Sequence, residues 1–246
     1  MSYNALGATY DQPEHVEVAT GFYKAIRPLL RGLKGRDVLD LGCGTGLVTE
    51  RIATHGCRVW GIDLSREMLK VARVRCRRFG SAVRFRAGDL RNFGGVPPAA
   101  AAFACADIAN HFTSERQLAA FFRNTCRRLE PGGVFVFDAL NRWCFETYWD
   151  GHTYRFEGPN GDILMECDWD PARSVGTASM IVYQRGPRGL YRRRRYDLRE
   201  RLYAERTLHR LLREAGFSSV SHVSWSPWTD QHLEASNDRT LWTAIR

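Results

Sequence analysis

Apolar and polar positions follow one pattern along residues 37–141. Short β-branched or apolar runs are separated by stretches in which apolar residues recur every three or four positions. This succession is typical of βαβ units around a parallel sheet. The last helical stretch begins at Ser114, which stands in capping-box spacing to Gln117. The predicted strands are DVLDL, RVWGID, AVRFRAG, AAFACAD and VFVFDAL, and the predicted helices cover about residues 47–55, 66–79 and 115–129.

A different pattern begins after residue 141. Alternating or aromatic-rich runs, with Gly, Pro, Asn and Asp between them, predict antiparallel strands at HTYRFEG, DILMECDWD, GTASMIVYQRG and LYRRRRYDLRERLY. A helix over about 204–215, ended by Gly216, and two strands, SVSHVSW and RTLWTAI, then close the first sheet. Before residue 36, apolar residues at helical spacing predict a helix that bends near Pro28.

Together these elements predict an α/β fold. We expect a Rossmann-like seven-stranded sheet with helices on both faces and an inserted small antiparallel β subdomain. A chain of 246 residues, 44% hydrophobic, suits one domain better than two. Within 1–246 we expect an N-terminal helical lid segment (1–35), a ligand-binding core (36–141), an antiparallel insertion (142–203) and a C-terminal helix with closing strands (204–246).

The net charge of +9 raises the question of a nucleic-acid partner. Only three of the 36 basic residues are lysines, and the arginines are spread along the chain apart from the run Arg192 to Arg195. No basic tail is present, so the charge alone does not favour nucleic acid. No segment approaches 18 consecutive apolar residues, and the first residues do not resemble a secretory signal. We therefore expect a cytoplasmic protein with no membrane partner.

Seven cysteines are scattered through the chain, with no CxxC and matching histidine pair. This pattern predicts reduced, buried thiols and no metal site.

Three glycines in VLDLGCGTG, residues 38–46, follow a strand and precede a helix. Such a turn lets backbone N–H groups approach a nucleotide-like ligand at a helix N-terminus. Gly42, Gly44 and Gly46 give GxGxG rather than the dinucleotide spacing GxGxxG, and Asp40 lies just upstream. That carboxylate would repel a pyrophosphate but hold the ammonium of an amino acid. We infer S-adenosylmethionine as the ligand and S-adenosylhomocysteine as its product; Cys43 lies within the ligand-facing loop.

Two further acids follow the next strands. Asp63 ends the second strand, where a carboxylate can accept hydrogen bonds from both ribose hydroxyls. Asp89, in the AGDL stretch after the third strand, can accept from the adenine amine. Each acid alone could be a helix cap or a turn residue. Three acids at the carboxyl ends of successive strands, together with the glycine turn, favour the ligand site. Its other predicted members are Leu64 and Met68, which flank the adenine, and Gly88 and Leu90, beside Asp89.

The runs VLDLGCGTG, GIDLSREML, AGDL, LEPGGVFVFDAL and LLREAGF, in this order, resemble the class I S-adenosylmethionine-dependent methyltransferases of the small-molecule group. The resemblance covers about residues 36–141 and 204–245. It departs from the family at the fourth strand, where PPAAAAF stands in place of an initial acid, so the start of this strand is left open. It implies a methionine site at Asp40, Gly42 and Gly44, a ribose acid at Asp63, and an adenine pocket at Leu64, Met68, Asp89 and Leu90.

The methyl-transfer residues come from the same resemblance. The segment ADIANHF, residues 106–112, resembles the stretch that reaches the edge of the methyl donor. It implies that Asp107 lies at the cofactor and that His111 is the general base, although His111 could instead be packed or solvated. Asn110 would orient an acceptor or cap the next helix. Tyr10 resembles the tyrosine that closes over the cofactor in related enzymes, the alternative being a surface residue of the lid.

Substrate choice is expected to reside in the insertion. Its arginines Arg192 to Arg195 alternate in a strand, so that one pair could clamp a carboxylate or phosphate. The alternative is a charged edge strand. The insertion's aromatic residues would wall an apolar substrate or form a packing layer; they are Trp143, Tyr148, Trp149, Tyr154 and Trp169.

Three functions fit these patterns. The first is methyl transfer to an O or N atom of a small-molecule acceptor by in-line displacement. The second is an RNA-modifying methyltransferase that uses the positive charge, for which no appended binding domain or NPPY-like motif is present. The third is a non-catalytic ligand-binding relative, against which Asp40, Asp63 and Asp89 argue. We expect the first, with a homodimer left open.

Overall fold

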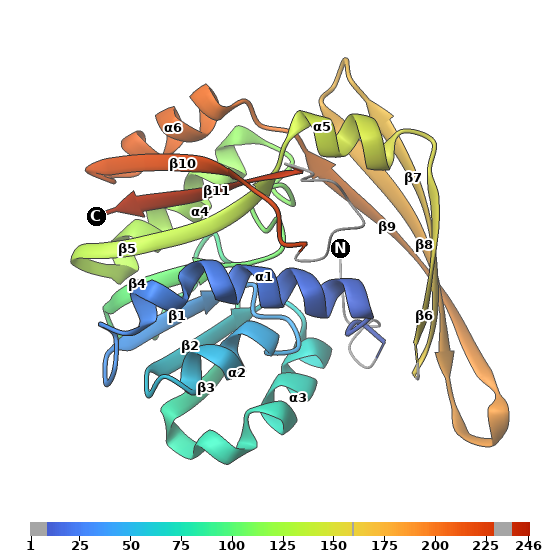
Figure 1. The fold of residues 1–246 in the computed structure, drawn as a ribbon, viewed down its shortest axis with the longest axis horizontal. Helices are drawn as coiled ribbons and strands as arrows, with labels where there is room; N and C mark the ends of the chain where they lie inside the picture. The colour runs from blue at the N-terminus through green and yellow to red at the C-terminus, as the bar shows by residue number, and fades with distance from the viewer. Residues whose placement is uncertain (1–8, 159, 229–237) are drawn as a thin grey trace.

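Two β-sheets and the helices around them make up the fold (Figure 1). The computed structural model describes residues 9–158, 160–228 and 238–246. The first eight residues of the predicted lid segment therefore lie outside the described residues. Among those that are described, no helix has the length and apolar character needed to cross a membrane.

The larger sheet has seven strands in the order β10-β11-β5-β4-β1-β2-β3. The first five strands in the chain pair in parallel, whereas β11 runs antiparallel to β5 and β10 antiparallel to β11. The order reverses between β1 and β4, the switch point at which open α/β sheets bind ligands. The strands are β1 (Asp37–Leu41), β2 (Arg58–Asp63), β3 (Val83–Ala87), β4 (Ala99–Ala104), β5 (Leu129–Leu140), β10 (Ser219–Trp225) and β11 (Arg239–Ile245).

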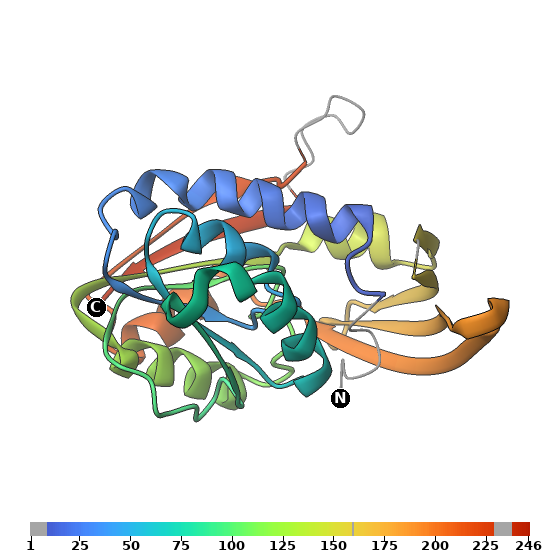
Figure 2. The same ribbon diagram turned by 90° about the horizontal axis from the view of Figure 1, so that it is seen from below.

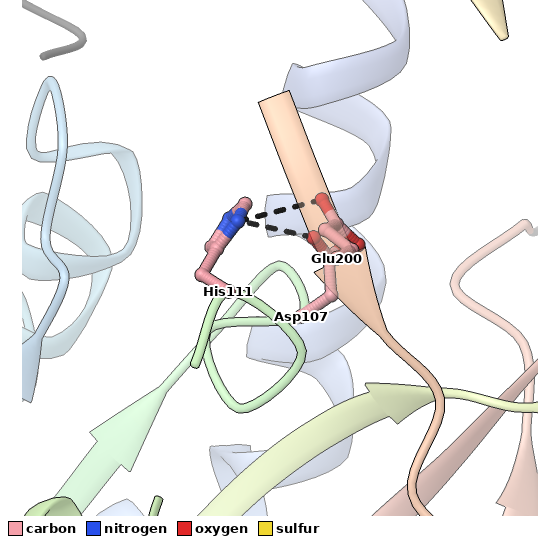
Figure 3. Close-up of side chains that lie close together, drawn as sticks. All are labelled: Asp107, His111 and Glu200. Atoms are coloured by element: carbon pink, nitrogen blue, oxygen red, sulfur yellow. Dashed lines mark ion pairs between the residues drawn. The ribbon is translucent and has the colours of Figure 1, made fainter. Parts of the chain in front are cut away.

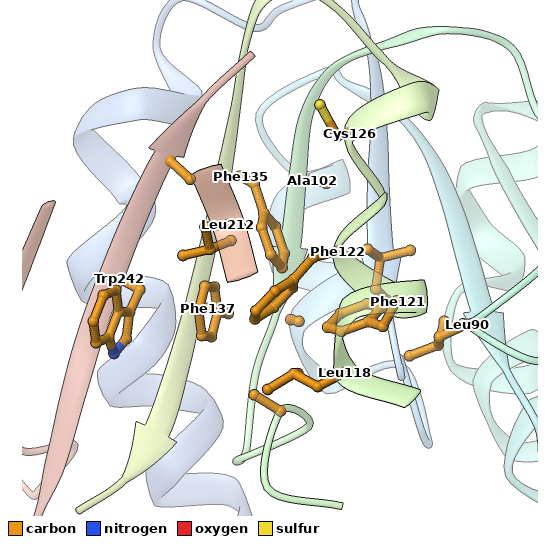
Figure 4. Packing of buried hydrophobic residues seen from close by; sticks show 14 of the residues in the cluster. Leu90, Ala102, Leu118, Phe121, Phe122, Cys126, Phe135, Phe137, Leu212 and Trp242 are labelled. Atoms are coloured by element: carbon orange, nitrogen blue, oxygen red, sulfur yellow. The ribbon is translucent and has the colours of Figure 1, made fainter. Parts of the chain in front are cut away.

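Helices cover both faces of this sheet, as predicted. On one face α1 (Pro13–Leu30) and α2 (Leu47–Ala53) pack against the strands, and on the other lie α4 (Glu115–Arg128) and α6 (Glu205–Glu214). Figure 2 shows α1 and α4 on opposite sides. Figure 4 shows aromatic residues of α4 facing β5 and β11. The cluster is fully buried and includes Phe121, Phe122, Phe135, Phe137 and Trp242.

Three boundaries differ from the prediction. The helix α3 (Arg66–Arg75) ends early and is followed by 3₁₀ turns at Arg77–Ala82, within which Gly80 has a φ of 55°. Strand β4 starts at Ala99, which resolves the start that the sequence left open. Strand β5 includes LEPGG, predicted only as a helix stop. The backbone there pairs with the last residue of the chain, since Gly132 donates to Arg246 and Arg246 donates to Gly133.

The smaller sheet is antiparallel, in the order β6-β7-β8-β9, as the alternating pattern predicted. Its strands are β6 (Thr153–Gly158), β7 (Gly161–Asp170), β8 (Val175–Arg185) and β9 (Tyr191–Arg201), and the β8–β9 hairpin projects from the body (Figure 1). Its inner face packs Ile163, Met180 and Val182 against Met68 of α3 and against Tyr10. The smaller sheet therefore lies next to the ligand-binding edge of the larger one.

A short helical segment precedes the smaller sheet and was not predicted. Helix α5 (Arg142–Cys144) continues into a π-helical turn at Phe145–Trp149. The side chain of Asn141 caps it by accepting from the backbone of Cys144. The aromatic residues of this stretch resemble those of a strand, which conceals the helix in the sequence.

All seven cysteines are buried and free, as expected.

Candidate functional site

The glycine loop, residues 42–46, joins β1 to α2. Gly42, Gly44 and Gly46 all have positive φ, and the Gly44 N–H donates to Oδ2 of Asp63 over 2.8 Å. A side-chain carbon at Gly44 would stand 4.0 Å from the ring of Tyr10, and one at Gly42 would lie 2.3 Å from Ile108. Only glycine fits this turn, because the backbone is left-handed and its neighbours approach closely.

Asp63 and Asp40 occupy different environments in this region. The second oxygen of Asp63 accepts from the backbone of Ser65 over 2.7 Å, so Asp63 ties the end of β2 to the glycine loop and to α3. Burial raises the pKa of Asp63, while the backbone N–H groups oppose the rise. Asp40 is 1% exposed, accepts from the hydroxyl of Thr49 on α2, and has its pKa raised by burial to about 7.

The structure places the predicted adenine residues in different environments. Leu64 is exposed and Met68 is buried beside Tyr10. The Gly88 N–H donates to the backbone of Asp63. Asp89 is held by the guanidinium of Arg91, whose Nε lies 2.9 Å from Oδ1, and this pairing lowers the pKa of Asp89. The pairing was not predicted.

Two neighbouring residues of the predicted site are part of the packing. Leu90 lies in the core cluster of α4 and β5, with little exposed surface. Cys43 is buried against β2, and burial raises the pKa of its thiol well above the usual range. A thiolate at Cys43 is therefore disfavoured, in agreement with a loop that presents backbone to its ligand.

The N-terminal segment crosses the glycine loop. Asp11 accepts from the hydroxyl of Thr45 over 2.5 Å and pairs with Arg75 of α3, while Nε of Arg75 donates to the Thr45 carbonyl over 3.0 Å. We call these three residues the latch. The Tyr10 ring next to it stacks on His15, with centroids 4.3 Å apart. Burial, with the carboxylates Asp107 and Asp63, raises the pKa of the Tyr10 phenol. Tyr10 therefore lies between the glycine loop and the segment after β4.

The segment after β4 is strained and firmly anchored. Ala106 and Asp107 have φ of 64° and 51°, a left-handed backbone that residues with a side chain seldom adopt. The Asn110 amide accepts from the backbone of Leu140 over 2.9 Å and donates to the carbonyl of Arg201 over 2.9 Å. The amide of Asn110 thus joins this segment to β5 and β9, and the helix-capping alternative is wrong because Ser114 caps α4. Orientation of an acceptor by Asn110 stays a prediction.

His111 faces two neighbouring carboxylates, which lie on the same side of its ring (Figure 3). Its Nε2 is 3.7 Å from Oδ2 of Asp107, and its Nδ1 is 3.5 Å from Oε1 of Glu200 on β9. Burial lowers the pKa of His111, so the imidazole is neutral near pH 7. Glu200 was missed because the run LRERLY resembles an exposed charged strand. Donor atoms of the three residues lie within 4.8 Å of one another, a spacing that a divalent cation could use.

The carboxylates continue inward as a buried network. NH1 of Arg239 lies 2.6 Å from Oδ1 of Asp107 and 2.5 Å from Oδ2 of Asp138, and its Nε is 3.7 Å from Asp238. Burial raises the pKa of Asp138 to about 6. The charge of Arg239 holds the pKa of Asp107 low although the carboxyl is buried. We call Asp107, Asp138, Asp238 and Glu200, with Arg239, the acid cluster.

The arginines singled out in the insertion lie on its surface, and two of its tryptophans lie in its packing. Arg192 to Arg195 are all exposed on β9, which is an edge strand, as the charged-edge reading expected. Trp149 and Trp169 are buried in a cluster with Phe145, whereas Trp143 is 42% exposed. The packing-layer reading therefore holds for Trp149 and Trp169.

Comparison with known proteins agrees with this geometry. Residues 38–133 match the family model described as methyltransferase domain. A ubiquinone biosynthesis O-methyltransferase of Idiomarina loihiensis is 33% identical over 112 residues, which are 45% of this chain and 45% of that protein. The chain spans about half the length of the curated relatives it matches.

Solved structures match over nearly the whole chain. A S-adenosylmethionine-dependent methyltransferase from Clostridium acetobutylicum has a TM-score of 0.80 at 22% identity and covers 99% of this chain and 98% of its own. CalS10, an amino pentose methyltransferase from Micromonospora echinaspora, has a TM-score of 0.69 at 21% identity and covers 99% and 96%. The comparisons agree with the resemblance drawn from the sequence: residues 38–133 match a methyltransferase domain model, and the chain shares its fold with solved S-adenosylmethionine-dependent methyltransferases.

Proposed function

We propose that the protein is a S-adenosylmethionine-dependent methyltransferase that transfers a methyl group to an O or N atom of a small-molecule acceptor by in-line displacement. The observation that carries the proposal is the bond between the Gly44 N–H and Asp63 at the switch point of the sheet. It places a left-handed glycine turn and a strand-end carboxylate together where open α/β sheets bind ligands. The methyltransferase domain of residues 38–133 supports the same function.

The residues present fit this cofactor. The left-handed turn at Gly44 keeps side-chain atoms away from the loop surface beneath Tyr10. In the proposal Asp40, Gly42 and Gly44 hold the methionine portion, Asp63 binds the ribose hydroxyls, and Met68 and Asp89 contact the adenine. When bound, S-adenosylmethionine supplies a methyl group activated by a positively charged sulfur.

The chain's own residues position the acceptor and remove its proton. Tyr10 and Ile108 border the glycine loop and exclude water from it. His111 is neutral and half-buried next to this region, with 23% of its side chain exposed, so it can accept a proton from the acceptor. Holding the acceptor atom about 3 Å from the methyl group, in line with the bond that breaks, accounts for most of the rate enhancement.

The acceptor side is formed in this proposal by residues 142–203, with residues 1–35 as the lid and 36–141 as the cofactor core. A small molecule is favoured over RNA because the exposed arginine run lies on the projecting hairpin rather than beside the glycine loop. One relative described above is named a ubiquinone biosynthesis O-methyltransferase, and one solved structure is named an amino pentose methyltransferase. The seven free thiols suit a reducing, cytoplasmic setting.

Calorimetric titration with S-adenosylhomocysteine tests the cofactor, with NAD titrated in parallel. We expect micromolar binding of S-adenosylhomocysteine and none of NAD; the reverse would refute the proposal. A metabolite library incubated with S-adenosylmethionine, with release of S-adenosylhomocysteine as the signal, then identifies the acceptor. A filter assay with tRNA serves as the control for the RNA-modifying alternative, which predicts tight binding that falls steeply with salt.

A further inference from the structure

We propose that the acceptor is an amine and that its ammonium group binds in the acid cluster, against Glu200 and Asp107. This inference rests on the proposed methyltransferase function and adds to it the chemical class of the substrate. It also assigns Glu200 as a substrate-binding residue, a role that no sequence motif indicates.

The acid cluster holds more carboxylates than cations. Its four acids have side-chain exposures between 0% and 13%. Among the described residues, the guanidinium of Arg239 and the imidazole of His111 are their only basic partners within ion-pair distance. Because burial keeps His111 neutral, Arg239 alone compensates three aspartates. Buried charge is costly unless it is paired, so this region has capacity for a further cation.

Glu200 is the acid that Arg239 does not reach. It is 2% exposed, and its Oε2 has no hydrogen-bond partner among the described residues. Its other oxygen lies 3.5 Å from Nδ1 of His111 (Figure 3). Burial and the nearby charge of Asp107 raise the pKa of Glu200, so the carboxyl keeps a proton and donates it toward Asp107. An ammonium group has three N–H donors and can replace this proton while satisfying both carboxylates.

The position of Glu200 on the smaller sheet suits a molecule that also has an apolar body. Strand register places Glu200, Gly176 and Trp169 in one row across β9, β8 and β7, so that the side chains of Glu200 and Trp169 lie on the same face with the glycine between them. The rings of Phe145 and Trp149 approach Gly176 so closely that a side-chain carbon there would lie 2.7 and 2.5 Å from them. The carboxyl of Glu200 is therefore at the border of an aromatic cluster.

The methyl-donor side lies within reach of this group. Ile108, which follows Asp107 in the chain, borders the glycine loop, since a side-chain carbon at Gly42 would lie 2.3 Å from it. An amine held by Asp107 and Glu200 is therefore next to the loop that holds the cofactor in the proposal.

The reaction balances with these residues. The bound ammonium gives one proton to His111 or Glu200, which frees the nitrogen lone pair. That lone pair forms the nitrogen–carbon bond as the methyl–sulfur bond of the donor breaks, and the electron pair of the broken bond stays on sulfur. The product is a methylammonium cation. An acceptor that reacts as a phenolate or carboxylate would be repelled by the same acids.

Matched acceptor pairs test the inference on the unaltered protein. Benzylamine with benzyl alcohol, cyclohexylamine with cyclohexanol, and glucosamine with glucose are each incubated with S-adenosylmethionine, and S-adenosylhomocysteine release is measured by mass spectrometry. We expect release with amines and none with their alcohols. Release with alcohols, or with no amine although S-adenosylhomocysteine binds, would overturn the amine proposal alone. Failure of S-adenosylhomocysteine to bind would overturn the methyltransferase function and, with it, the proposal.

Glu200→Gln keeps the shape of the side chain, but the amide cannot become the carboxylate that would pair with the ammonium. We expect at least a tenfold rise in the KM of the best amine, with the Kd of S-adenosylhomocysteine changed less than twofold. The control is Glu157→Gln on β6, whose side chain is 64% exposed, and it should leave both constants unchanged. An unchanged KM in Glu200→Gln would refute the role of Glu200. Because the same donor atoms could hold a metal, the assays are repeated with EDTA and with added Mn²⁺; metal-dependent turnover would also refute an ammonium site.

Discussion

The proposed cofactor side and acceptor side of the candidate site differ in the chemical groups that form them. On the proposed cofactor side, the backbone N–H of Gly44 in the glycine turn and that of Ser65 at the start of α3 donate to one carboxylate, Asp63, that lies nearby in the chain. On the acceptor side, side chains as distant as Asp107 and Arg239 form a buried charged network. A site made from backbone depends on local turn geometry and tolerates change elsewhere in the fold. A buried charge network depends on each of its members, because removing one leaves the others unpaired.

The largest effect is expected from His111→Ala on the acceptor side. Loss of a general base costs roughly 10²–10⁴-fold in rate, so turnover should fall by about that factor while affinity for S-adenosylhomocysteine changes only a few fold. Burial lowers the pKa of His111, so the unaltered enzyme should lose rate as pH falls through a value below 6.5. The variant should lack this limb in its kcat–pH profile. Turnover above about a third of the parent rate at saturating acceptor would show that His111 is structural.

Arg239→Met tests the statement that the acid cluster depends on each member. It removes the cation shared by Asp107, Asp138 and Asp238, and breaking such a buried pairing costs about 3–5 kcal/mol of unfolding free energy. Urea denaturation measures the loss. Because unpaired buried aspartates become protonated as pH falls, the loss should be smaller at pH 5 than at pH 8. Arg213→Met on α6, an exposed arginine, is the control; an equal effect in the two variants would contradict the network.

Asp63→Ala tests the cofactor side. The ribose hydroxyls lose a charge-assisted acceptor, so the binding free energy of S-adenosylhomocysteine should weaken by about 2–3 kcal/mol. This corresponds to a rise in Kd on the order of 30–150-fold. Thermal stability should fall only slightly, because Asp63 lies at a strand end and is partly exposed. The titration is made by calorimetry. The control is Asp37→Ala, because Asp37 begins β1 at the end of the sheet opposite to Asp63, which ends β2. An unchanged Kd would mean that another residue binds the ribose.

Arg75→Gln should have the smallest effect. It removes the ion pair that holds Asp11 over the glycine loop and the bond from Arg75 to the Thr45 carbonyl, and it leaves the three glycines unchanged. Since these contacts are partly exposed, we expect a weakening of S-adenosylhomocysteine binding of about fivefold, roughly 1 kcal/mol. Arg73→Gln on the same helix, whose exposed guanidinium contacts the carbonyl of Phe85, is the matched control. Equal affinities in the two variants would show that the latch does not contribute to binding.

The sequence could predict the features that depend on residues close together in the chain, and it could not predict those that depend on distant residues. The fold, the glycine turn and Asp63 were accessible because periodicity and local motifs report on neighbours in the chain. Glu200 was not, because RER in an alternating strand gives no sign that its central residue faces a buried histidine. Asn110 was misread because its partners, Leu140 and Arg201, are distant in sequence. The pairing of Asp89 with Arg91 was missed for another reason, since motifs describe contacts to a ligand and omit the protein's own competing donors.

Arg239 lies near the end of the chain, so the acid cluster is completed late in synthesis. The glycine turn, Asp63 and Asp89 leave the ribosome within one continuous stretch, whereas Asp107 and Asp138 wait for a strand about a hundred residues later in synthesis. Until β11 inserts beside β5, these two aspartates have no arginine between them and favour water over the interior. A nascent chain can thus form the glycine turn with Asp63 first, whereas Asp107 and Asp138 gain their shared cation only when β11 inserts.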